Sequence, residues 1–408
     1  MIKHICSVTF FVCGLLVIIP VADATDSAVP EPFQRFNAAS TYTIKYGDLD
    51  GLLRASVVNT GRSTREKAEP AVAKTGTRMK QTGVKRSTVT EGNRFMYEAF
   101  KANEENLELL GAIRNSLEKI PAEVPLEYFS RDEQLAYWLN LYNITILNEI
   151  AQVYPERKLK KLLVGKKSIL SKKLLTITGI PLSLNDIQFI ILKQNYNNNP
   201  LIMYGLYQGI IGGPNIRRRA YTSENVYRNL ENNAVEFINS NRGTSGKSTR
   251  VFRVSSLYAR DKGYFADFDS DLKVHLLQYL EAPESEELQA ATTLKPDIND
   301  WTVTDLYGSY ARIGGSFANN NAAMLDSVKN VSIDGEGNAF STNFSAASSM
   351  MISKAPATSR VSPELNAYLQ DINMRREATA AQNATVTIEE LGEVPVDPEP
   401  DSDDEGNN

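Results

Sequence analysis

The sequence predicts an α+β protein: a single large, helix-rich domain with a small antiparallel sheet, followed by a disordered acidic C-terminal tail. Amphipathic segments with apolar residues three or four positions apart are long and numerous, whereas strand-like runs are few and short. Strands and helices do not alternate in the regular order that indicates a parallel sheet. The composition, with 42% hydrophobic and 23% charged residues, is typical of a globular protein.

The first 24 residues have the features of a secretory signal peptide. Lys3 gives a positive start, an apolar stretch follows, and Ala22 and Ala24 stand where a signal peptidase requires small residues. We expect cleavage after Ala24. The alternative is an uncleaved anchor, but the apolar run is shorter than the roughly 20 residues that span a bilayer. The cleaved protein would be secreted or periplasmic, with no cysteine, one histidine and no transmembrane segment.

The remaining chain divides by composition into four parts. Residues 25–40 are predicted as a flexible N-terminal segment and residues 41–332 as the domain. Residues 333–376 form an extension rich in Ser, Ala and Asn with one short helix, and residues 377–408 form the tail. Within the tail, residues 388–408 contain nine acids, three prolines and no base, which predicts a solvated, disordered segment.

The strongest helix signal begins at Ser130. Ser130 and Glu133 have capping-box spacing, in which each side chain can accept a free backbone N–H. Apolar side chains then recur at helical spacing and predict a central core helix: Leu135, Trp138, Leu139, Tyr142 and Ile146.

Five further elements follow this helix. Two apolar runs around Gly179 predict a β-hairpin. Ser183 then caps a second helix, with Asp186 favourably placed in its first turn. Beyond these, the patterns predict a helix over 221–240, a strand over 249–256 and an amphipathic helix over 269–280.

Basic residues cluster at residues 62–94, 157–173 and 217–219. The second cluster has eight bases and no acid. Such clusters can attract anionic partners, but we favour the interpretation that they are solvated surface. Aromatic residues are not interleaved with the bases, so no nucleic-acid partner is predicted.

The sequence contains few patterns that indicate chemistry. It lacks an HExxH motif, a Walker loop and a dinucleotide-binding fingerprint, so neither a metal nor a cofactor is predicted. His275 lies within the predicted helix over 269–280, where we expect it to pack rather than to catalyse. The acids at residues 267–273 lack the rest of a calcium-binding loop and are interpreted as a helix N-terminus.

The stretch from Asn199 to Tyr221, here called the loop stretch, joins a glycine-rich turn, Pro214 and three arginines. Glycine permits positive φ and proline restricts the next step, so a defined backbone shape is expected. Gln208 and the arginines could hold an anionic or carbonyl-bearing ligand. The stretch contains no residue that usually performs catalysis, and the sequence offers no paired carboxylates beside it.

Three segments in order resemble a known family, the secreted bacterial branch of domain of unknown function 547. They are residues 133–147 (EQLAYWLNLYNITIL), 181–192 (PLSLNDIQFIIL) and 220–243 (AYTSENVYRNLENNAVEFINSNRG). The resemblance covers roughly residues 41–332, which makes this a domain of unknown function 547-like domain. It implies a shared fold and export but no reaction, because the family's function is not established.

The loop stretch departs from the pattern of that family. Many members have a histidine and two cysteines there, and this chain has Met203, Gln208 and Gly213 in their places. If those members use a thiol, as the resemblance implies, this chain cannot, because an amide is not a nucleophile and a thioether is not a proton acceptor.

Three hypotheses follow. The favoured one is a non-catalytic binding or scaffold protein on an enzyme-like fold, for an anionic or carbonyl-bearing small molecule or peptide. The alternative is a hydrolase or transferase that uses non-thiol residues around 203–219, with groups such as Tyr142 or Asp186 as acid or base. In the third, the loop stretch is purely structural. The candidate binding residues are Met203, Gln208, Gly209, Gly213, Arg217, Asn140, Asn143 and Asp186.

Overall fold

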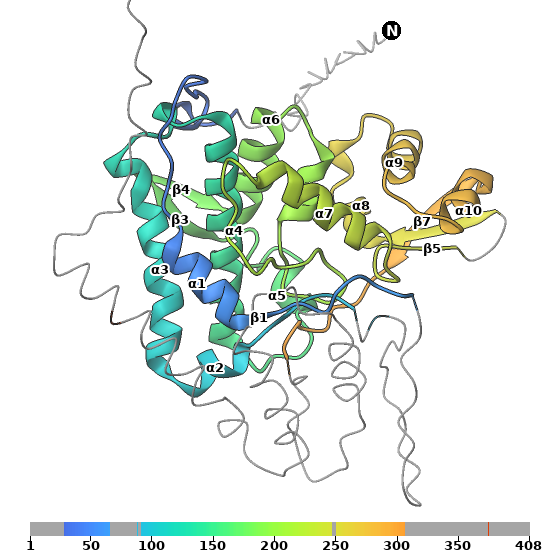
Figure 1. The fold of residues 1–408 in the computed structure, drawn as a ribbon, viewed down its shortest axis with the longest axis horizontal. Helices are drawn as coiled ribbons and strands as arrows, with labels where there is room; N and C mark the ends of the chain where they lie inside the picture. Colours follow the sequence, from blue (N-terminus) through green and yellow to red (C-terminus); the bar gives the residue numbers. More distant parts are fainter. Residues whose placement is uncertain (1–27, 66–87, 89–90, 247–249, 307–373, 375–408) are drawn as a thin grey trace, which may run out of the picture.

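The computed structural model describes residues 28–65, 88, 91–246, 250–306 and 374. The predicted signal peptide and C-terminal tail, and nearly all of the extension, lie outside this range. In Figure 1 the long helices α3 and α4 stand side by side at one end of the molecule. The strands β5 and β7 lie at the other end with α9 and α10.

The described elements, in chain order within each class, have the following bounds. The α-helices are α1 (Gly47–Ser56), α2 (Tyr97–Ala102), α3 (Glu104–Glu123), α4 (Arg131–Val153), α5 (Lys160–Leu163), α6 (Lys193–Asn195), α7 (Val226–Ile238), α8 (Ser256–Arg260), α9 (Phe268–Leu277) and α10 (Glu284–Ala290). The strands are β1 (Val57–Val58), β2 (Arg94–Phe95), β3 (Lys173–Ile177), β4 (Ile180–Ser183), β5 (Thr244–Gly246), β6 (Val251–Ser255) and β7 (Thr293–Ile298). The remaining turns are the 3-10 helices η1 (Glu31–Phe33), η2 (Leu126–Tyr128), η4 (Pro200–Gly205) and η5 (Lys262–Tyr264), and the π-helical segment η3 (Asp186–Leu192).

The strands form three small sheets, and the predicted α+β class is confirmed. The pairs β1–β2, β3–β4 and β5–β6 are antiparallel, whereas β7 joins β6 in parallel. The parallel pair is possible because the chain passes through α8, α9 and α10 between these two strands. In the predicted β3–β4 hairpin, Thr178 and Gly179 have φ values of 48° and 81°, as a tight two-residue turn requires.

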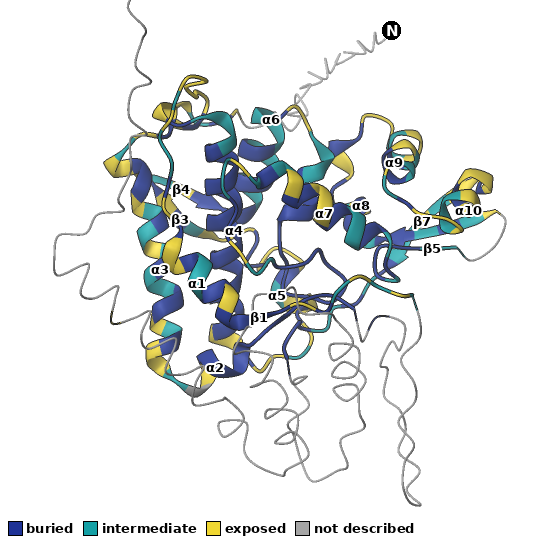
Figure 2. Cartoon of the chain, viewed as in Figure 1, coloured by how far each residue is buried: buried dark blue, intermediate teal, exposed yellow. Residues whose placement is uncertain are grey.

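The central helix α4 is confirmed, and it is buried on all sides rather than on one face (Figure 2). Ser130 accepts a hydrogen bond from the backbone of Glu133, as the capping box predicts. The Glu133 carboxylate instead joins α4 to two distant segments. Its oxygens accept from the backbone N–H groups of Ile44 at 3.1 Å and Ser223 at 3.3 Å.

The helix predicted after Ser183 adopts a wider π-helical form over η3. The predicted helix over 221–240, the strand over 249–256 and the helix over 269–280 correspond to α7, β6 and α9. Asp267 caps α9 by accepting from the backbone of Ser270, so the acidic segment there is a helix N-terminus as expected.

The glycine-rich part of the loop stretch is held by a segment near the end of the described chain. Ile211 N–H donates to the carbonyl of Thr302 at 2.8 Å, and Gly212 N–H donates to that of Asp300 at 2.9 Å. In return, Thr304 N–H donates to the carbonyl of Gly209 at 2.9 Å. This pairing satisfies backbone groups that would otherwise be buried without partners.

A substitution at Gly209 tests whether the glycine-rich turn requires a glycine at this position. Its φ is 72°, and an added Cβ would lie 2.0 Å from Cδ1 of the buried Ile150. We expect Gly209→Ala to lower the free energy of unfolding by about 2–4 kcal/mol, through backbone strain and overpacking together. Gly179→Ala is the matched control, because Gly179 also has positive φ but nothing lies within 4 Å of its added Cβ. It should cost about 1–2 kcal/mol. Equal losses in urea unfolding would contradict this account of the turn.

Candidate functional site

Asn140 and Asn143 project from α4 and bind the backbone of the loop stretch. The Asn140 amide donates to the carbonyl of Tyr221 at 2.8 Å and accepts from its N–H at 2.9 Å. The Asn143 amide donates to the carbonyl of Gly205 and accepts from the N–H of Tyr207, both at 2.9 Å. Each buried amide therefore acts like a short piece of β-ladder, with its oxygen and its NH₂ group both engaged.

Arg217 joins the two asparagines around a small cavity between α1, α4 and the loop stretch. All three residues line it, and its volume is about 10 Å³, which is room for about one water molecule. The Arg217 guanidinium donates to the side-chain oxygen of Asn233 at 3.2 Å. The structure thus brings three candidate residues together without leaving space for a larger ligand.

Met203 is fully buried, and Gln208 is 5% exposed. With its amide oxygen turned toward Arg260, Gln208 accepts from both terminal nitrogens of that guanidinium, at 2.6 and 2.9 Å. Arg260 also forms a two-bond ion pair with the buried Asp261, at 2.7 and 3.0 Å. Position 208 is therefore an internal hydrogen-bonding site. Nearby, burial raises the pKa of Tyr142 to about 12, with Arg260 opposing the shift.

Asp186 has a structural role at the start of η3. It accepts hydrogen bonds from the N–H and hydroxyl of Ser183, both at 2.6 Å, and pairs with Lys173 at 2.5 Å. Burial would raise the pKa of Asp186, but the hydrogen bonds from Lys173 and Ser183 hold it below its ordinary value. These partners lie on the β3–β4 hairpin, so Asp186 is engaged there rather than with the loop stretch.

Gly213 connects the loop stretch to α7 through Arg242. The buried Arg242 guanidinium donates to the carbonyl of Gly213 at 2.7 Å and to the carboxylate of Glu236. Glu236 lies within α7, so one arginine links the glycine-rich turn to that helix. Burial raises the pKa of Glu236, and Arg242 opposes the rise.

A pair of buried carboxylates lies beside the loop stretch, contrary to the expectation from sequence. Glu98 and Asp305 each place an oxygen 2.9 Å from the hydroxyl of Tyr154. Asp305 follows Thr304, whose N–H binds Gly209. The hydroxyl has one proton and can donate to only one carboxylate at a time. No local pattern indicates this pair, because its members are far apart in the chain.

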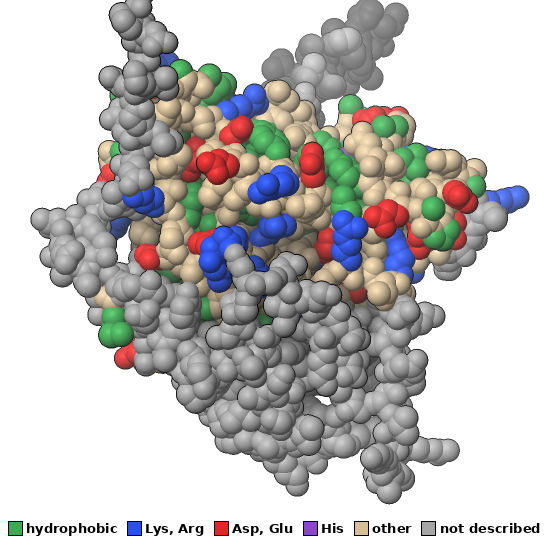
Figure 3. Space-filling view, viewed as in Figure 1, with side chains coloured by type: hydrophobic (Ala, Val, Ile, Leu, Met, Phe, Trp, Pro, Cys, Tyr) green, Lys and Arg blue, Asp and Glu red, His purple; other side chains and the backbone are tan. Residues whose placement is uncertain are grey.

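Part of the basic clusters is not solvated surface, which corrects that interpretation for two residues. Arg94 is buried, and the side chain of Arg65 is 18% exposed. Arg65 donates to the carbonyls of Ile238 and Thr244 at 3.1 and 2.8 Å, where a cation complements the C-terminal end of α7. On the face shown in Figure 3, basic side chains are interspersed with acidic ones and form no broad basic field.

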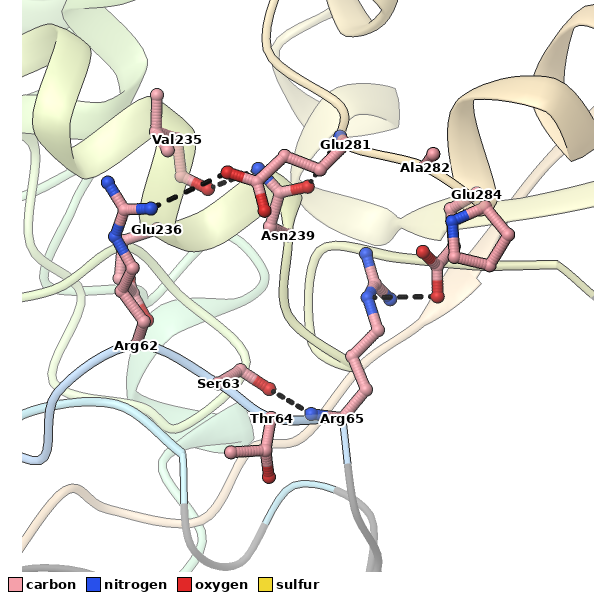
Figure 4. A pocket seen from close by; sticks show the side chains of 11 residues that line it. Arg62, Ser63, Thr64, Arg65, Val235, Glu236, Asn239, Glu281, Ala282 and Glu284 are labelled. Atoms are coloured by element: carbon pink, nitrogen blue, oxygen red, sulfur yellow. Dashed lines mark hydrogen bonds and ion pairs between the residues drawn. The ribbon is translucent and has the colours of Figure 1, made fainter. Parts of the chain in front are cut away.

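A polar cavity of about 310 Å³ lies beyond the C-terminal half of α7 (Figure 4). Three segments line it: residues 62–65, residues 235–239 of α7 and its end, and residues 281–284. Arg62 faces Glu281 across the cavity at 3.5 Å, and Arg65 pairs with Glu284 at 3.1 Å. The sequence could not place these residues together, because more than 150 residues separate residues 62–65 from the other two segments.

The described residues contain no group of three or more His, Cys, Asp or Glu side chains arranged to hold a metal ion. Among the same residues, no helix is both long and apolar enough to cross a membrane.

His275 packs in the core, as expected for α9. Its ring stacks on Tyr204 and contacts Phe265 and Tyr279, and Nε2 lies 2.9 Å from the Tyr204 hydroxyl. Burial lowers the pKa of His275 from 6.5 to about 4. No charged group contributes to that shift.

The lowered pKa predicts an acid-dependent loss of stability. Between pH 6.5 and pH 4 the unfolded chain binds a proton at His275 that the folded chain does not. The stability present above pH 6.5 should therefore fall by about 3 kcal/mol down to pH 4 from this group alone. His275→Gln should lack this part of the decline, whereas carboxylates titrate in both proteins. Urea unfolding of both at pH 7 and pH 4.5 measures the difference, and parallel declines would contradict the prediction.

A family model described as "Protein of unknown function, DUF547" matches residues 126–238. The match runs from η2 to the end of α7 and includes α4 and the loop stretch. It is shorter than the resemblance expected from sequence, and it excludes Arg62, Arg65, residues 281–284 and the segment that holds the glycine-rich turn. No curated protein and no solved structure matches the chain. Residues 126–238 are therefore similar to the DUF547 family, whose function is unknown, and this match supports membership for that part of the chain.

Proposed function

We propose that this is an exported, non-catalytic binding protein that takes a carboxylate-bearing small molecule or peptide into the cavity beside α7. The observation that carries the proposal is the cavity itself. Its volume of about 310 Å³ is at the lower end of the range of ligand pockets, roughly 300–1,000 Å³. The cavity at the loop stretch, by comparison, holds about one water molecule.

The two ion pairs of the cavity differ in how easily a ligand can open them. The side chains of Arg62 and Glu281 are 73% and 63% exposed, and their contact is long at 3.5 Å. An exposed pair of this kind contributes roughly 0–1 kcal/mol. A ligand carboxylate can therefore replace Glu281 as the partner of Arg62 at little cost. Arg65 is fixed by its hydrogen bonds to the end of α7 and by Glu284, and it keeps the wall in place.

The loop stretch supports this cavity in the proposal rather than contacting the ligand. Arg242 holds Glu236, which lines the cavity, and binds the carbonyl of Gly213. The glycine-rich turn is thus connected through Arg242 to Glu236 in the cavity wall, so its backbone shape affects the position of that wall. This arrangement gives the stretch a reason to keep its shape without a thiol.

The hydrolase or transferase alternative has weaker support from the same geometry. Asn140, Asn143 and Asp186 are engaged in hydrogen bonds that hold the backbone or cap a helix. Tyr142 is buried, and within the described part of the chain its hydroxyl has no hydrogen-bond partner to act as a base. The paired carboxylates Glu98 and Asp305 are buried as well.

Ligand binding can be tested with short peptides that end in a free carboxylate and with the same peptides as C-terminal amides. Only the carboxylate forms should raise the midpoint of thermal unfolding, because ligand that binds the folded state stabilises it. Arg62→Gln should weaken the affinity measured by calorimetry by up to about fivefold, since an ion pair of an exposed arginine contributes at most about 1 kcal/mol.

Arg54→Gln is the matched control, because Arg54 is also partly exposed and paired, with Asp50 at 2.8 Å, but lies on α1 outside the cavity. It should bind like the wild type. The proposal is wrong if no carboxylate-bearing probe binds, or if the two variants bind equally.

Export can be tested by determining the N-terminal residue of the protein after it is purified from the cell envelope or the culture medium of its native host. Mass spectrometry should find a chain that begins at Thr25 and has lost both cysteines. Ala24→Arg should block this processing, because the peptidase site requires a small residue. Recovery of the wild-type protein with residues 1–24 still attached would refute the cleavage.

A further inference from the structure

Four lysines form an exposed patch around α5, here called the lysine patch: Lys160, Lys161, Lys166 and Lys167. In the part of the chain that the structure describes, none of the four ammonium groups forms an ion pair or a hydrogen bond. The backbone of this segment turns back on itself, since Ile169 N–H donates to the carbonyl of Leu162 at 3.0 Å. The four positive charges are therefore held within one compact segment.

Two acids that contact lysines of this segment, Asp300 and Asp186, bind Lys158 and Lys173 rather than the lysine patch. Residues 157–173 include no acid. Asp300 lies 3.7 Å from Lys158 and accepts hydrogen bonds from Thr88 and Thr302. Asp186 pairs with Lys173. Among the residues that the structure describes, no acid pairs with the lysine patch. Val164, which is 49% exposed, lies between its two halves.

The fold brings the end of the last continuous described segment alongside this region (Figure 1). Leu159 N–H donates to the carbonyl of Trp301 at 2.9 Å, and Val303 N–H donates to that of Arg157 at 3.0 Å. Lys158 and Thr302 form an isolated antiparallel bridge. The chain thus runs past the start of the basic segment only a few residues before it continues toward the acidic C-terminus.

We propose that the acidic segment at residues 388–408 docks on the lysine patch of its own chain. The charges are complementary, with nine acids and no base in one segment and four unpaired lysines in the other. More than eighty residues separate Leu306 from Glu389, so chain length does not prevent the contact. Because the segment is tethered, its effective concentration is on the order of millimolar, and a weak electrostatic contact suffices.

The docked segment shields the patch from other anions and makes access to it dependent on salt. At about 0.5 M NaCl the screening length falls to roughly 4 Å, so the segment should be released. Docking does not involve the cavity beside α7, so it can fail or succeed independently of the proposed ligand binding.

Zero-length carbodiimide cross-linking of the full chain tests the contact, because the reagent joins a carboxylate to an amine only where they touch. At low salt, cross-links from residues 389–405 should favour the lysine patch several-fold over three other exposed lysines: Lys101, Lys119 and Lys262. Mixing ¹⁴N- and ¹⁵N-labelled protein identifies cross-links within one chain. Equal yields on all lysines, or links only between chains, would overturn the proposal; the latter would assign the patch to a second copy.

Cleavage by a glutamate-specific protease gives a second measurement that does not need the lysines as reactants. Replacing all four patch lysines with glutamine should speed cleavage after Glu390 and Glu393 several-fold at low salt and leave it unchanged at high salt. Lys101→Gln, Lys119→Gln and Lys262→Gln combined in one variant should cleave like the wild type. If the two variants cleave at the same rate at low salt, the segment does not dock on the patch.

Discussion

The fold depends on hydrogen-bond partners for the backbone of one irregular, buried stretch. Between η4 and α7 the chain crosses the core without forming a regular helix or strand, yet its N–H and C=O groups must have partners there. Asn140 and Asn143 supply several of them from α4, each engaging a donor and an acceptor. An unpaired buried group would cost roughly 1–3 kcal/mol, so these two amides tie the position of the stretch to that of the central helix.

The same constraint explains the surroundings of α4. A helix that serves both as core and as hydrogen-bonding partner cannot leave one face in water, and α4 is buried all round. Glu133 extends this role by binding the backbone at Ile44 and Ser223. The segment around Thr302 forms backbone hydrogen bonds to the other side of the glycine-rich turn. Residues from the middle and the end of the described chain therefore hold a single loop.

This tight internal bonding separates the shape of the loop from any chemistry at its surface. Met203, Gln208 and Gly213 take positions at which relatives are expected to have histidine and cysteines, and here they pack, bind Arg260 or accept from Arg242. The sequence therefore indicated that these residues have specific roles. In the structure, their contacts hold the fold. The cavity beside α7 is built from three separate segments of the chain, and the sequence showed its weakly paired Arg62 only as one member of a basic cluster.

The sequence by itself determined the fold class and those elements that have a strong local pattern. Capping at Ser130, Ser183 and Asp267, the hairpin at Gly179 and the apolar periodicities of α4, α7 and α9 are local patterns, and local patterns need only neighbouring residues. The tertiary structure decided the partners of polar side chains. Whether an asparagine holds a backbone, an arginine ends a helix or two carboxylates share Tyr154 depends on contacts across more than fifty residues. Such contacts are fixed by packing, and they leave no periodic trace in the chain.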